Sequence, residues 1–213
     1  ILGIVIVSLV TTIYYFREDI FASDWERQRA ESLTVPQEAM ELNDAVTVCV
    51  EQIASESLNI LGQQGGYIVI PDDSVGDQNL FSNSLEIFYG SGFRTTYWFY
   101  QAANGVDKSQ VPTIEFMQQE LSNYMNGNLA SCVETYDLFG EYNATVGNID
   151  SEVEIQNDQV LFTVNYPVKI VLEDYSYDLD SFYVSQSVPL GSLYDYAVEI
   201  MDAENKNYNL EEL

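Results

Sequence analysis

The chain has 213 residues, of which 34 are Asp or Glu and only 7 are Lys or Arg, so its formal net charge is -27 at pH 7. Because contacts to phosphates require a basic surface, this charge argues strongly against a nucleic-acid partner and against flat docking on an anionic membrane leaflet. This excess of negative charge suits a protein in a high-salt or calcium-rich medium outside the cell, or simply provides an acidic, soluble surface. The length and the hydrophobic content of 46% predict one domain with a real core behind an N-terminal arm.

The chain contains no histidine. Every His-dependent triad, His-ligated zinc site and imidazole acid–base mechanism is therefore excluded. Two carboxylates could act as acid and base on a glycan, but no spacing singles out such a pair, so no catalytic residue and no cofactor is predicted.

Two groups of aspartates could bring hard oxygens onto a calcium ion, but neither has the EF-hand spacing. They are predicted to be solvated turn residues, which leaves no predicted metal site. The two groups are Asp72, Asp73 and Asp77, and Asp174, Asp178 and Asp180.

The first sixteen residues carry no charge. As an α-helix at about 1.5 Å per residue, this segment would be roughly 24 Å long, shorter than the roughly 30 Å hydrocarbon core of a bilayer. It is predicted to be either a membrane span clipped at its start or a helix buried among copies of itself. The apolar side chains of this assembly or anchor helix are Ile1, Leu2, Ile4, Val5, Ile6, Val7, Leu9, Val10, Ile13 and Phe16. The helix is expected to continue to about Ala30 with an amphipathic second half, so that residues 1–33 form the arm and residues 34–213 the head.

Two long amphipathic helices are predicted in the head, over about residues 36–61 and 113–133. Apolar residues recur in both at intervals of three and four, and Gly62 is a natural C-terminal cap for the first. Each helix carries one of the two cysteines, Cys49 and Cys132, near its apolar side. In an anchored domain outside the cytoplasm the simplest prediction is one disulfide, worth about 4 kcal/mol, and two separate buried thiols are the alternative. The sequon at Asn143 permits a surface glycan.

Short strands are predicted between these helices. Residues 67–70 form one, after a turn at 63–66, and residues 85–89 and 93–100 form a hairpin around a Gly-Ser-Gly turn. The second strand of that hairpin contains Trp98 in the most aromatic run of the chain. This run is predicted to be core, with stacking on sugars or on a neighbouring subunit as the alternative.

The apolar period changes to two after Asn143. A strand at 153–155, a turn at 157–158, a long strand at 160–172 and a further strand at 175–188 are predicted, with Pro167 at an edge or a bulge. A last helix begins at Leu190 and fades into the acidic tail at 205–213. The predicted fold class is therefore α+β, with a long N-terminal hydrophobic helix followed by a head of amphipathic helices packed on an antiparallel sheet.

The uncharged segment at residues 1–16, followed by residues 17–30, resembles type IV pilins and the archaeal surface proteins made with pilin-type leader peptides. Residues 49–53, 61–68 and 97–100 are similar to stretches of uncharacterised membrane-anchored proteins of small archaea. The resemblance to pilins implies that the apolar helices bundle in the centre of a filament while the heads form its outer wall. Val5 stands where many bacterial pilins have glutamate, and archaeal pilins often lack that glutamate.

These features predict a non-enzymatic, extracellular cell-surface protein, a pilin-like subunit that polymerises through its N-terminal helix. The alternative is a membrane-anchored binding or adhesion module that recognises a glycan, an envelope layer or a partner protein. The predicted partners are other copies of the chain, the membrane before assembly, and a cell-surface glycan or a partner cell.

Overall fold

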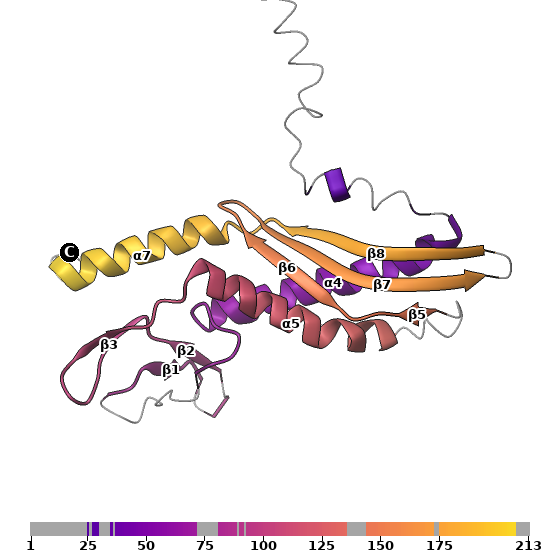
Figure 1. Ribbon diagram of the computed structural model, residues 1–213. Coiled ribbons are helices and arrows are strands. Elements are labelled where there is room, and N and C mark those ends of the chain that lie inside the picture. The colour runs from indigo at the N-terminus through magenta and orange to yellow at the C-terminus, as the bar shows by residue number, and fades with distance from the viewer. Residues whose placement is uncertain are drawn as a thin grey trace, which may run out of the picture.

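Figure 1 shows the computed structural model of the chain, which describes residues 25, 27–29, 35, 37–71, 81–88, 90–91, 93–135, 144–172 and 175–207. Several predictions lie outside these residues. They are the assembly or anchor helix at residues 1–16, the glycan at Asn143, the aspartates Asp72, Asp73, Asp77 and Asp174, and the end of the acidic tail.

The two long helices are confirmed as α4 (Gln37–Gln63) and α5 (Ile114–Thr135). The hydroxyl oxygen of Thr113 accepts a hydrogen bond from the backbone N–H of Phe116 at 3.1 Å, which caps the first turn of α5. The predicted cap at Gly62 is wrong, because α4 continues to Gln63 and the positive φ angles fall on Gly65 and Gly66. The backbone N–H of Gly66 then donates to the carbonyl of Leu61 at 2.8 Å, closing the helix end one turn later.

The sheet has four antiparallel strands, with β7 (Val160–Leu172) in the middle. Strand β8 (Tyr175–Gln186) pairs along one edge of β7, while β5 (Thr145–Val146) and β6 (Asp150–Ile155) pair in succession along the other. The register shifts between Asn165 and Val168, where β7 has two residues opposite the single Asp180 of β8. This confirms the prediction of a bulge at Pro167, which cannot donate to the ladder.

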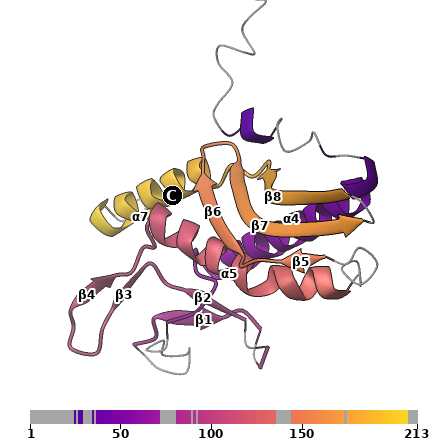
Figure 2. The same ribbon diagram turned by 45° about the vertical axis from the view of Figure 1, so that its right-hand side comes forward.

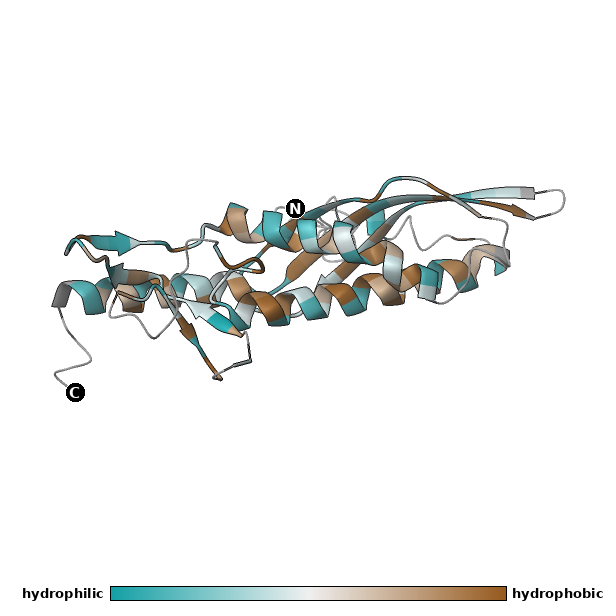
Figure 3. Cartoon of the chain, turned by 90° about the horizontal axis from the view of Figure 1, so that it is seen from below, coloured by the Kyte–Doolittle hydropathy of each residue, from teal (hydrophilic) through white to brown (hydrophobic). Residues whose placement is uncertain are grey.

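Helices α4 and α5 lie side by side on one face of this sheet (Figures 1 and 3). Alternate residues of β7 point into the core, as the period of two predicts, and they meet apolar side chains from both helices. Ser122 on α5 and Ser151 on β6 exchange buried hydrogen bonds, in which each hydroxyl donates to the other residue's carbonyl, at 2.6 and 3.1 Å. The fold is therefore α+β, and we call these two helices and the sheet the body. Its largest fully buried side chains include Phe162, Leu42, Leu61, Met117, Leu121, Met125, Leu129 and Ile170.

Two short hairpins lie on the side of α5 away from the sheet (Figures 1 and 2). The first, β1 (Ser84–Glu86) with β2 (Arg94–Thr96), confirms the hairpin around the Gly-Ser-Gly turn. The second, β3 (Phe99–Gln101) with β4 (Asp107–Ser109), was not predicted. The expected single strand from residue 93 to 100 is therefore interrupted at 97–98.

The strand predicted at residues 67–70 is wrong, because this segment joins no sheet. The backbone N–H groups of Ile68 and Val69 donate instead to the carboxylate of Glu120 on α5, at 3.1 and 2.8 Å. The carboxylate of Glu120 thus accepts the two hydrogen bonds that a neighbouring strand would otherwise accept.

The last helix is confirmed as α7 (Leu190–Asn207). Its first turn docks on the β6–β7 turn, where the hydroxyl of Ser192 donates to the carbonyl of Asn157 at 2.8 Å. Gly191 is required there, because a Cβ at this position would lie 2.6 Å from the carbonyl oxygen of Gln156. Among the described residues, no helix is both long and apolar enough to span a membrane.

Candidate functional site

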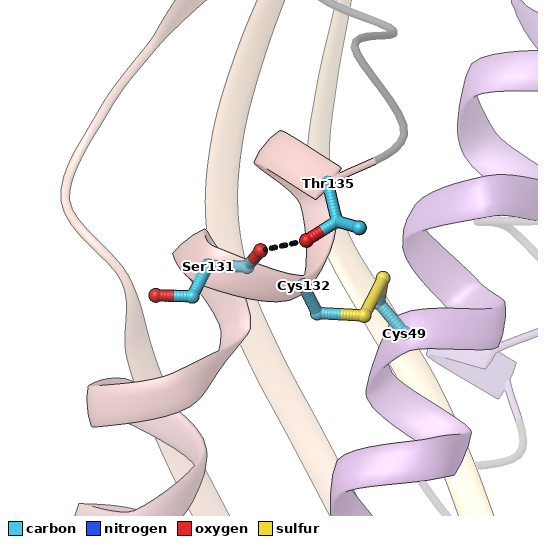
Figure 4. Close-up of a disulfide and its surroundings, with 4 residues drawn as sticks. All are labelled: Cys49, Ser131, Cys132 and Thr135. Carbon is cyan, nitrogen blue, oxygen red and sulfur yellow. Dashed lines mark hydrogen bonds between the residues drawn. A yellow bond between two sulfur atoms is a disulfide. The ribbon is translucent and has the colours of Figure 1, made fainter.

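The two cysteines form a disulfide, as predicted. Cys49 on α4 and Cys132 on α5 are joined with their Cα atoms 5.8 Å apart (Figure 4). The hydroxyl of Thr135 donates to the carbonyl of Ser131 at 2.8 Å at the end of the same helix. A disulfide persists in an oxidising compartment, so this pairing fits a location outside the cytoplasm.

Trp98 connects three parts of the head. Its indole N–H donates to the carbonyl of Gly65 at 2.7 Å, just beyond the end of α4. Its ring lies 5.9 Å from that of Tyr194 on α7, at an interplanar angle of 57°. The next residue, Gly66, approaches the start of α5 closely, because its φ is 91° and a Cβ there would lie 2.5 Å from the Cγ of Pro112.

An apolar cavity of about 220 Å³ lies beside Trp98, between the end of α4, the start of α5 and α7. Its lining is almost entirely hydrocarbon and aromatic, so it offers shape and apolar contact without polar groups for chemistry. It is lined by Leu61, Gly62, Gly65, Gly66, Trp98, Met117, Leu190, Leu193, Tyr194 and Ala197.

The aromatic run around Trp98 is not core, which corrects the prediction. Of residues 95–100 only Thr96 is buried, and Phe99 is 40% exposed. The run supplies β2, β3 and the two residues between them, outside the body, and its aromatic residues Tyr97, Trp98 and Tyr100 are half-buried.

The hairpin of β1 and β2 carries the most exposed apolar side chains of this region. Phe88 is 71% exposed, and Leu85, Ile87 and Phe93 are between 43% and 48% exposed. We call residues 84–96 the apolar hairpin. Its base is fixed: the hydroxyl of Thr95 donates to the carbonyl of Gln63 at 2.7 Å.

A second set of exposed apolar side chains lies on α7. Leu193, Tyr196 and Ile200 are between 56% and 65% exposed, at helical spacing of three and four. Carboxylates such as Asp195 and Glu199 are interspersed with them along the helix, so this surface is acidic as well as apolar.

Two tyrosines of this region, Tyr67 and Tyr194, have raised pKa values. Burial raises the pKa of Tyr67, whose hydroxyl donates to the carbonyl of Gln110 at 2.6 Å. Burial, followed by the charges of Asp195 and Glu115, also raises the pKa of Tyr194. Neutral phenols do not act as bases at neutral pH, and the described residues contain no group of three metal-ligating side chains.

The described part of the arm lies on the face of the sheet opposite α4 and α5. Trp25 and residues 27–29 are helical, and the ring of Trp25 stacks edge-on against Tyr183 of β8 with centroids 6.1 Å apart. The hydroxyl of Tyr183 donates to the side-chain oxygen of Gln28 at 3.2 Å, and the guanidinium of Arg29 lies 5.5 Å from the centre of the Trp25 ring.

Comparisons with protein-family models, with curated proteins and with solved structures found no match. The structure brings together Cys49 and Cys132 among the predicted site residues. It also identifies residues that sequence reasoning did not single out, above all Glu120 and Tyr194, whose partners lie more than 50 residues away in the sequence. The double glycine at 65–66 was predicted as a turn, which is confirmed, but only the close approach of Pro112 explains why glycine is needed.

Proposed function

We propose that the chain is a non-enzymatic cell-surface subunit that polymerises through residues 1–16 into an extracellular filament and presents residues 34–213 as its head. The observation that carries the proposal is the uncharged leading segment of a chain whose net charge is -27. Each fully buried apolar side chain of such a segment stabilises the assembled state by about 1 to 3 kcal/mol. Association with copies of itself withdraws the segment from water.

The head is consistent with this role. The core that the structure describes draws on residues between Ala39 and Val184, so α4, α5 and the sheet bury one another's apolar faces. The disulfide across the two helices suits an exposed extracellular location. Because the body buries its apolar faces within itself, it is suited to the outer wall of an assembly.

Electron microscopy of the negatively stained full chain tests the proposal. We expect filaments from the full chain and from a Val5→Leu variant. A Val5→Asp variant places a charge in the apolar segment and should abolish filaments, because an unpaired buried charge is strongly destabilising. Deleting residues 1–16 should give a monomer in sedimentation.

Discrete single particles of the full chain in detergent, with no filaments under any salt condition, would contradict polymerisation. That result favours the membrane-anchored binding module, for which the exposed apolar hairpin is the observation in favour. Salt is part of the test, because acidic heads packed side by side repel one another unless ions screen them. Filaments should therefore be more stable at 0.5 M salt than at 0.01 M salt, conditions with Debye lengths of roughly 4 and 30 Å.

A further inference from the structure

The apolar hairpin projects from a fixed base. The backbone N–H of Tyr97 and the side-chain amide of Gln110 both donate to the carbonyl of Asn83, at 2.9 and 3.0 Å. At the other end, the backbone N–H of Ile87 donates to the carbonyl of Phe93 at 3.0 Å. The tip closes with a turn in which Gly90 has a φ of 79° and the N–H of Ser91 donates to the carbonyl of Phe88 at 2.9 Å. The side chains of Ile87, Phe88 and Phe93 are thus exposed at the closed end of a hairpin whose base is hydrogen-bonded to its surroundings.

This part of an acidic chain is electrically neutral. Residues 78–106 contain two charged side chains, Glu86 and Arg94, and these have opposite signs and face each other in the strand register. The rest of the chain therefore carries the whole net charge of -27. A neutral apolar tip can enter a medium that would exclude the rest of the head.

The distribution of the apolar side chains indicates which medium this is. Ile87 and Phe88 lie in the bend after β1 and Phe93 lies just before β2, so exposed apolar side chains flank the closed end of the hairpin on both strands. A flat protein surface would cover only part of such an end, whereas a fluid bilayer surrounds it. The four exposed side chains offer roughly 400 Å², about half of what one partner contributes to a stable protein interface.

The hairpin and the described residues of the arm, 25 and 27–29, lie on opposite sides of the body. Trp25 packs over the outer face of β8, while β1 and β2 lie beyond α5 in both views (Figures 1 and 2). The hairpin and the described residues of the arm therefore lie apart on the body.

From these observations we infer that the apolar hairpin is a lipid-contact element, which inserts Ile87, Phe88 and Phe93 into the interface of a neutral bilayer facing the head. Aromatic side chains settle at this depth, and the absence of charge at the tip avoids the cost of burying an ion. The acidic head limits the contact to zwitterionic lipid, because an anionic leaflet repels it. The inference does not depend on the filament, since a monomer or a polymer would present the same tip.

Fluorescence of a Phe88→Trp variant of the full chain tests this directly. The probe is vesicles of phosphatidylcholine with brominated acyl chains, which quench an indole only when it enters the bilayer. We expect a blue shift and quenching for Phe88→Trp relative to wild type, and about a tenfold loss of tip insertion in a Phe93→Asp background. Replacing half of the lipid with phosphatidylglycerol should reduce the quenching, and salt should restore it.

Tyr196→Trp is the matched control, because Tyr196 is 65% exposed on α7 outside the hairpin. It should show no added quenching, even when the leading segment itself carries the protein to the vesicles. Equal quenching of the two variants, or none in Phe88→Trp, would overturn the inference. Concentration-dependent self-association that Phe88→Asp abolishes in the absence of lipid would overturn it in favour of a second copy as the partner.

Discussion

The body and the apolar hairpin use the same kinds of side chain in opposite ways. Phe162 in β7 is fully buried between the sheet and its helices, whereas Phe88 in the hairpin is 71% exposed. The body has two layers that cover each other's apolar faces, while no second layer among the described residues covers the tip of the two-stranded hairpin. Apolar residues therefore stabilise the fold in the body and remain available to a partner in the hairpin.

Removing the disulfide is the largest expected perturbation of the body. The disulfide closes a loop with a sequence separation of 83, and the chain-entropy relation gives a stabilisation of about 4.5 kcal/mol for a loop of this length. The double variant Cys49→Ala and Cys132→Ala should lose this free energy of unfolding in urea titrations, and reduced wild type should match it. Equal stability of the oxidised and reduced chains would show that the bridge does not hold the two helices together.

Truncating one phenylalanine in each region gives the sharpest contrast. Phe162→Ala should lower the free energy of unfolding by about 4 kcal/mol, because it leaves a cavity in a closed core. Phe88→Ala should change it by less than about 0.5 kcal/mol, because its side chain is already in solvent. Similar losses in the two variants, measured by urea denaturation, would mean that the hairpin packs against the body.

Two glycines should respond to alanine with opposite signs. Gly66→Ala should destabilise the head by roughly 1 to 3 kcal/mol, because φ is 91° and the new methyl would meet Pro112 and Met117. Gly127→Ala in α5 should stabilise it by about 0.5 to 1 kcal/mol, since nothing lies within 4 Å and alanine favours a helix. Thermal unfolding of both variants measures this, and stabilisation by Gly66→Ala would contradict the tight junction between α4 and α5.

Replacing Tyr67 by phenylalanine should give the smallest change in the free energy of unfolding, and this change should be visible at high pH. Burial raises its pKa above 10.0, so the unfolded chain loses the phenolic proton first. The stability from neutral Tyr67 is fully present below pH 10 and is lost as the pH rises through the folded-state pKa. The difference between the urea midpoints at pH 8 and at pH 11 should therefore be smaller in Tyr67→Phe than in wild type. Tyr196→Phe, on exposed α7, should keep the wild-type difference.

The elements of the body were predictable from local pattern. The three-and-four spacing around Leu42 and Val46 predicts α4, and the alternation from Val160 to Leu172 predicts β7, because each pattern matches a single buried face. The cysteine pairing was predicted from the presence of two cysteines in a domain expected outside the cytoplasm, and the same spacing placed each of them near the apolar side of its helix. Pro167 signalled the bulge because proline lacks the N–H that a central ladder requires.

The hairpin region was harder because its determinants are distant in sequence. Residues 67–70 have the composition of a strand, yet Glu120 on α5 accepts their N–H groups. Trp98 has the composition of a core residue, yet its partners are Gly65 and Tyr194. No local rule identifies a hydrogen-bond acceptor 50 residues away. The exposure of Phe88 follows from the absence of a covering layer among the described elements.

Three-dimensional reconstruction of the assembly formed by the full chain tests the central proposal most directly. We predict a filament in which residues 1–16 of neighbouring copies form an apolar bundle along the axis. The disulfide-linked heads should lie outside it, with their apolar hairpins in solvent. A dispersed monomer in which residues 1–16 pack into their own head would contradict the account.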